Sequence, residues 1–105
     1  PVKKYSKWKS KTNQKVKLLS QHFEETYLTI LRNIYIELED TYEISLDDYL
    51  DEYCFIHGVD NCSTLDVIES NSDLKRLFDC AVDSLLEKYG LQSEISNERR
   101  KTIFN

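Results

Sequence analysis

The stretch TNQKVKLLSQHFEETYLTILRNIYIELEDT, residues 12–41, decides the fold. Its large apolar side chains recur at steps of three and four residues, which is the spacing of one face of an α-helix. They are Val16, Leu19, Phe23, Tyr27, Ile30, Leu31, Ile34 and Leu38. The pattern predicts one long helix, about 45 Å at 1.5 Å per residue. A compact domain of this size does not easily cover such a helix, so either its first turns project or a second copy packs on it in a homodimer.

A second, shorter helix is expected after Ser45. This serine precedes two aspartates and is a good N-cap, and the helix runs to about His57 before stopping at Gly58. Its large side chains share one face, except for Phe55, which points the opposite way, and Ile56, which lies to one side. The helix is therefore either packed centrally between others or exposes Phe55 to a partner.

Two more helices are expected in the rest of the chain. Ser63, with Asp66 three residues later, resembles a capping box and begins a helix of about two turns. Ser72 is expected to cap a last strong helix over about residues 73–89, which Gly90 ends in a Schellman turn.

The composition supports a single all-α domain. The chain has 105 residues with only two Gly and one Pro, which disfavours a fold rich in turns. We predict a small bundle of four, possibly five, helices with one long N-terminal helix. The domain organisation expected is a flexible basic arm over 1–11, the bundle over 12–91, and a polar tail over 92–105 that possibly contains a short helix.

The sequence favours a cytoplasmic protein. No window approaches the roughly 18 apolar residues that a membrane span needs, and the Lys-rich N-terminus lacks the apolar stretch of a secretory signal. The odd number of cysteines, three, fits reduced thiols better than a disulfide framework, although a single bridge remains open.

Charge is strongly segregated along the chain. Residues 1–17 contain seven Lys and no acidic residue, whereas residues 18–91 contain 17 acidic and four basic side chains. The net charge of −5 therefore hides an acidic body joined to a basic arm.

The acidic body contains a surface that is suited to a basic partner. Residues 35–53 contain eight carboxylates, with four tyrosines distributed among them. Carboxylates steer association with a basic protein, and tyrosines supply contact area at low entropic cost. We expect a regulator or inhibitor of a nucleic-acid-handling protein, since an acidic surface competes for the same Lys and Arg side chains as phosphates do. The acidic face predicted to bind this partner consists of Glu39, Asp40, Tyr42, Glu43, Asp47, Asp48, Asp51 and Glu52.

The basic arm suggests an alternative, nucleic-acid binding. Lysines neutralise phosphates and an aromatic ring stacks on bases. The residues concerned are Lys3, Lys4, Lys7, Trp8, Lys9 and Lys11. The arm could also be a solvated tail or fold back on the acidic body, and a membrane surface is the least favoured partner.

No catalytic constellation or cofactor motif is recognisable. The only histidines are His22 and His57, and the two isolated glycines cannot form a phosphate-binding loop. We therefore expect no enzyme activity and no cofactor.

Four residues have the chemistry of zinc ligands: Cys54, His57, Cys62 and Cys80. The first three lie within nine residues, but the spacing lacks the paired CxxC knuckle of strong zinc sites. The favoured interpretation is a core thiol at Cys54 and incidental cysteines elsewhere, with no metal bound.

Overall fold

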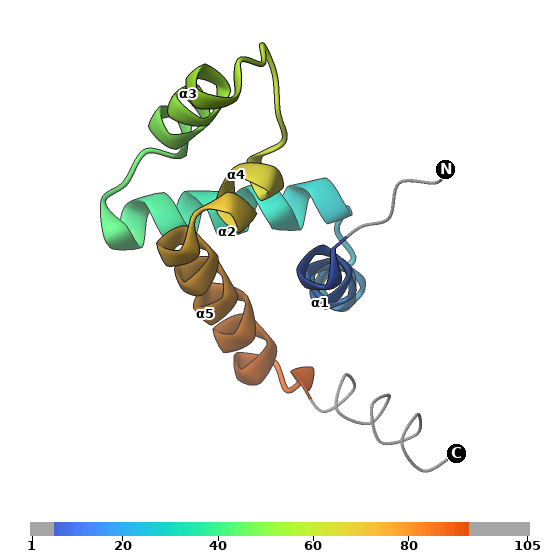
Figure 1. Cartoon of the computed structure of the whole chain (residues 1–105). Coiled ribbons are helices and arrows are strands. Elements are labelled where there is room, and N and C mark those ends of the chain that lie inside the picture. Colours follow the sequence, from blue (N-terminus) through green and yellow to red (C-terminus); the bar gives the residue numbers. More distant parts are fainter. Residues whose placement is uncertain (1–5, 93–105) are drawn as a thin grey trace, which may run out of the picture.

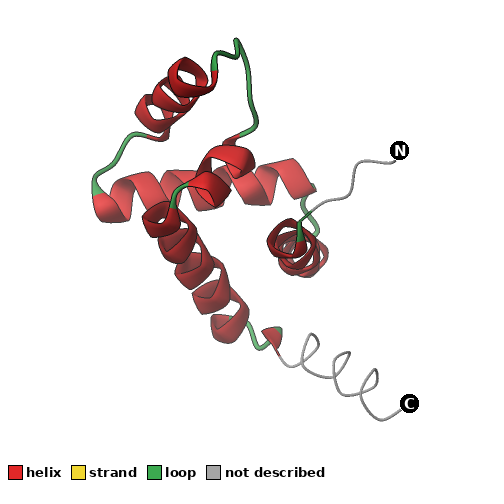
Figure 2. Ribbon diagram, viewed as in Figure 1, coloured by secondary structure: helices red, strands yellow, loops and turns green. Residues whose placement is uncertain are grey.

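The computed structural model describes residues 6–92, and within that range the chain forms five α-helices and no strand (Figures 1 and 2). The helices are α1 (Lys7–Phe23), α2 (Tyr27–Tyr42), α3 (Leu46–His57), α4 (Thr64–Ser70) and α5 (Ser72–Lys88). This confirms the small all-α bundle. The tail helix expected beyond residue 92 lies outside the described residues.

The prediction of one long N-terminal helix is wrong, because the chain turns a corner between α1 and α2. Glu24 adopts a left-handed conformation with φ 55°, and the N–H of Glu25 donates to the Ser20 carbonyl at 3.0 Å. Thr26 then caps α2 with its hydroxyl oxygen. The corner lets α1 fold back against α2 and α5, so that one chain buries the apolar stripe that a rod would leave bare.

The boundary of the flexible arm at residue 11 is also wrong, since α1 begins at Lys7. The centroid of the Trp8 ring lies 5.7 Å from that of Phe78, and the Trp8 indole N–H donates to the Asp79 carboxylate at 2.8 Å. This long-range packing offsets the few tenths of a kcal/mol that each lysine costs near a helix N-terminus. Residues 1–5 of the predicted arm lie outside the described residues.

The core lies where α1, α2, α4 and α5 meet, around the fully buried ring of Phe78. The periodic stripe predicted most of its members correctly, but Phe23 lies at the surface and Tyr27 is only half-buried. The buried cluster comprises Val16, Leu19, Ile30, Leu31, Ile34, Leu38, Leu46, Ile68, Leu74, Phe78, Val82 and Leu86.

Most of the predicted helix ends are confirmed. Ser45 and Ser63 cap α3 and α4, while Gly58 and Gly90 adopt the left-handed conformation after α3 and α5. The cap of α5 differs from the prediction, because Asn71 rather than Ser72 accepts hydrogen bonds from the first-turn N–H groups, at 3.0 and 3.1 Å. Asparagine and serine are equally good N-caps, so composition does not distinguish them.

Helix α3 is the least integrated element of the described fold. It packs mainly against α4, and Leu46 is its only buried residue. Figure 1 shows α3 at the edge of the molecule, away from α1 and from the far end of α5. The sequence left two alternatives for this helix, central packing between other helices or exposure of Phe55. The structure has the second arrangement, with α3 at the surface.

Candidate functional site

The outer face of α3 combines three carboxylates with an aromatic ring. Asp48, Asp51, Glu52 and Phe55 follow one another at helical spacing and are all exposed, and Phe55 is 88% exposed. A Phe ring exposed to this degree is unusual, because burying such a side chain is worth about 1.5–3 kcal/mol. We call these four residues the α3 outer face.

Apolar side chains extend this face towards the end of α3. Ile56 and Val59 are also exposed and follow Phe55 within four residues. The helical phase of Phe55 already indicated its outward direction, whereas the exposure of Ile56 and Val59 depends on α3 having no neighbour on that side. The exposed surface is thus acidic along the middle of α3 and apolar at its C-terminal end.

One member of the predicted acidic face has a structural role. The carboxylate Oε2 of Glu39, at the end of α2, accepts a hydrogen bond from the Leu46 backbone N–H at 2.9 Å. A negative group there satisfies an otherwise unpaired donor and complements the positive end of the α3 dipole. Glu39 therefore holds α3 in place rather than standing open to a partner.

Of the tyrosines interleaved with the acids, Tyr35 and Tyr49 pack inward and Tyr53 is half-buried. Tyr49 packs against the core, and the Tyr53 ring lies 4.2 Å from the His57 ring. Tyr35 packs on Phe78, with ring centroids 6.3 Å apart, and burial raises its pKa well above the ordinary 10.0, with a smaller contribution from Tyr27. Of the predicted partner-binding residues, Tyr42 is the tyrosine that stays at the surface.

The other predicted acids remain exposed and without a cationic partner in the described part of the chain. Asp40, Glu43 and Asp47 surround the α2–α3 turn, next to the α3 outer face. Within residues 6–92, ion pairs join Lys9 to Asp66, Lys15 to Asp83 and Arg76 to Asp73. None of these pairs uses a carboxylate of the acidic face.

The basic residues at the N-terminal end of α1 are partly engaged within the fold. Lys9 pairs with Asp66 on α4, and Lys15 Nζ lies 2.7 Å from the Asp83 carboxylate on α5. Of the nucleic-acid-binding residues predicted, Trp8 is packed on the core, and Lys7 and Lys11 are exposed on α1. Lys3 and Lys4 fall outside the described residues.

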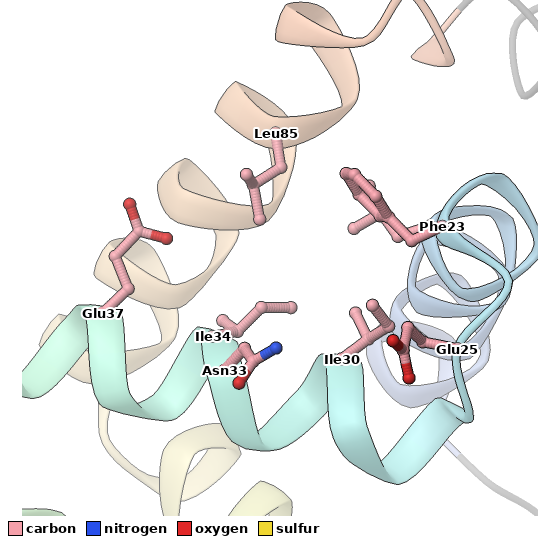
Figure 3. A pocket seen from close by; sticks show the side chains of 8 residues that line it. Phe23, Glu25, Ile30, Asn33, Ile34, Glu37 and Leu85 are labelled. Atoms are coloured by element: carbon pink, nitrogen blue, oxygen red, sulfur yellow. The ribbon is translucent and has the colours of Figure 1, made fainter.

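A groove of about 350 Å³ lies between α1, α2 and α5 (Figure 3). Phe23 and Leu85 face each other across it above Ile30 and Ile34, with a carboxylate at each end of the α2 side. The lining residues are Leu19, Phe23, Glu25, Ile30, Asn33, Ile34, Glu37 and Leu85. These eight side chains include no Cys, Ser, His or Lys, and their ionisable groups are the carboxylates of Glu25 and Glu37.

The structure brings together two of the four possible zinc ligands. The Sγ atoms of Cys54 and Cys62 lie 3.3 Å apart, whereas His57 and Cys80 are both exposed, Cys80 on α5. Among the described residues, no group of three metal-ligating side chains converges. Desolvation, the contact with Cys54 and the charge of Asp66 raise the pKa of the Cys62 thiol.

The α3 outer face and the groove are therefore candidates for binding a partner, and the α3 outer face overlaps the predicted acidic face. No helix within residues 6–92 has the length and apolar character to cross a membrane. Comparison of the chain with protein-family models, with curated proteins and with solved structures found no match.

Proposed function

We propose that this protein is a non-catalytic interaction module that docks the α3 outer face on a basic, nucleic-acid-handling protein in the cytoplasm and regulates or inhibits it. The observation that carries the proposal is the 88% exposed Phe55 ring one turn after Asp51 and Glu52. An aromatic anchor beside carboxylates combines the two elements of a strong protein–protein contact.

The two parts of this face have different roles in binding. The carboxylates attract a basic partner over roughly a Debye length, about 8–10 Å at physiological salt, and set its orientation. The Phe55 ring then gives up its exposed surface to an apolar pocket on the partner, which contributes most to slow dissociation.

The acidic character favours a partner that handles nucleic acid. Such proteins present Lys and Arg clusters to the phosphate backbone, and a dense set of carboxylates is attracted to the same clusters. Asp40, Glu43 and Asp47 add to the charge beside the α3 outer face, and no Lys or Arg within residues 6–92 pairs with them. Competition with phosphate for such a cluster would make this protein an inhibitor.

The experiment is affinity capture from lysate with the full chain and four variants, two of them controls. Asp51→Lys and Phe55→Ser alter the α3 outer face. Glu87→Lys changes an exposed acid on α5 by the same charge, and Leu28→Ser removes an apolar side chain that is 67% exposed on α2.

We expect the wild type and both controls to capture a basic protein, which salt elutes. The two α3 variants should not retain this protein. Equal retention of every captured protein by the two α3 variants would show that this face is not the docking site. Melting curves of all variants establish that each is folded.

Nucleic-acid binding through α1 is the second candidate, favoured by three exposed lysines, Lys7, Lys11 and Lys17, none of which forms an ion pair within residues 6–92. Changing all three to Gln is expected to reduce the log–log salt slope of binding by up to about three units if each contacts a phosphate. The absence of any binding to DNA or RNA at low salt would eliminate this candidate.

A further inference from the structure

The two cysteines that lie together occupy the ends of one turn. Cys54 is in the last turn of α3, and Cys62 lies in the loop just before Ser63, the N-cap of α4. Gly58 ends α3 with φ 64°, and the Val59 N–H returns to the Cys54 carbonyl at 3.0 Å. The turn therefore directs the loop back along α3 and brings the two thiols together.

The separation of the two sulfur atoms is small enough for a bond to form with little movement. The Sγ atoms are 3.3 Å apart, and a disulfide bond is about 2.05 Å long, so an approach of roughly 1.3 Å is needed. Both side chains are half-buried, which leaves them open to a small reagent. Helix α3 is held by few contacts, because Leu46 is its one buried residue.

We propose that Cys54 and Cys62 are a modification site, at which a small-molecule disulfide such as oxidised glutathione forms an intrachain disulfide bond. The bond fastens the C-terminal end of α3 to the loop that leads into α4.

The reaction is a pair of thiol–disulfide exchanges. One cysteine loses its proton, attacks the oxidant and forms a mixed disulfide, releasing one molecule of the small thiol. The second cysteine loses its proton, attacks the protein sulfur of the mixed disulfide and releases the other small thiol. Two electrons and two protons thus leave the protein, and the oxidant becomes two thiols.

The bond would act on the α3 outer face, a consequence that depends on the proposed function above. Phe55 follows Cys54 directly, and Ile56 and Val59 lie in the segment that the bond would close. Fixing this segment restricts the orientations of the apolar end of the face. The oxidised protein would present Phe55 in a narrower set of positions than the reduced protein.

The test equilibrates the full chain with defined ratios of oxidised to reduced glutathione, followed by alkylation and peptide mapping. Three proteins are compared: wild type, Cys80→Ser and Cys62→Ser. Cys80 is the exposed internal control, since it has no neighbouring thiol among the described residues. In wild type and Cys80→Ser we expect a linked 54–62 peptide and loss of the mass of two hydrogen atoms. In Cys62→Ser we expect Cys54 to carry a single glutathione.

The proposal is overturned if Cys54 and Cys62 remain alkylatable, carry glutathione separately, or join different chains under conditions that modify Cys80. The peptide map requires no partner, so a negative result leaves the docking proposal standing. Conversely, a linked peptide together with unaltered capture by Phe55→Ser would count against the docking proposal alone.

Discussion

Two phenylalanines in this chain have opposite environments, although they are chemically identical. Phe78 is fully buried and in contact with Trp8 and Tyr35, whereas Phe55 is 88% exposed. We expect Phe78→Ala to lower the free energy of unfolding by about 3–5 kcal/mol, and Phe55→Ala to change it by no more than about 0.5 kcal/mol. Chemical denaturation followed by Trp8 fluorescence measures both. A large loss for Phe55→Ala would mean that the ring is covered in solution.

The buried phenol of Tyr35 makes stability depend on alkaline pH. Burial raises the pKa of Tyr35 well above 10.0, so the folded chain keeps a proton that the unfolded chain releases. The stability associated with this group is therefore complete below about pH 10 and is lost as the pH rises further. We expect Tyr35→Phe to lose less free energy of unfolding than the wild type between about pH 9 and 11. Denaturant titrations at pH 7 provide the baseline, and parallel losses in the two proteins would contradict this assignment.

At the scale of the elements, the ends of α1 and α2 contain local strain. Glu24 and Glu43 adopt left-handed φ values of 55° and 53°, which cost a residue with a Cβ about 1–2 kcal/mol. Glycine avoids most of this cost, so Glu24→Gly should raise the free energy of unfolding by about 0.5–1 kcal/mol. Glu37→Gly, in the middle of α2, should lower it by about 1 kcal/mol. Urea denaturation distinguishes the two, and destabilisation of both variants would refute the role of the corner.

The periodicity of the sequence predicted burial better than it predicted where helices end. Leu19, Ile34 and Leu38 are buried as expected, because burial follows from which face an apolar side chain occupies. The same spacing continues across Glu24, so it could not reveal the corner. Thr26 is the only local signal for a new helix, and a threonine within a helix is not unusual.

The start of α1 has one local signal, its N-cap Ser6, whose hydroxyl oxygen accepts from the Lys9 N–H at 3.1 Å. The lysines after Ser6 disfavour a helix N-terminus, and the compensating contacts come from Phe78 and Asp79, far along the chain. The candidate site was predicted in part for the same reason. Its acids were identified from charge, but the inward direction of Tyr49 depends on where α3 packs.

For the whole molecule, the division of charge has two outcomes. Carboxylates on α4 and α5, such as Asp66 and Asp83, attach α1 to the fold through Lys9 and Lys15. The acidic face on α2 and α3 is left without these partners. Within residues 6–92, ion pairs therefore neutralise part of the basic segment, and none of them involves the acidic face. The corner at Glu24 also removes the length argument for a homodimer, which stays an untested prediction.

The five helices are packed to different extents, so we expect their local stabilities to differ. Helix α3 buries one residue, whereas α2 and α5 each bury four. We expect the amide hydrogens of α3 to exchange with solvent through local opening, well before those of α2 and α5. Hydrogen–deuterium exchange at neutral pH under reducing conditions measures this order. Simultaneous exchange of α3 and α5 would indicate a single cooperative unit instead.

The three-residue corner at Glu24 also bears on domain swapping, in which two molecules exchange a helix. Straightened, α1 and α2 would become one rod, and α1 would leave its place beside α5 empty. The α1 helix of a neighbouring molecule has the same shape and the same Trp8 and Lys15, so it could occupy that place, and the exchange could be mutual. The conformations of Glu24 and Thr26 thus keep α1 packed within its own chain.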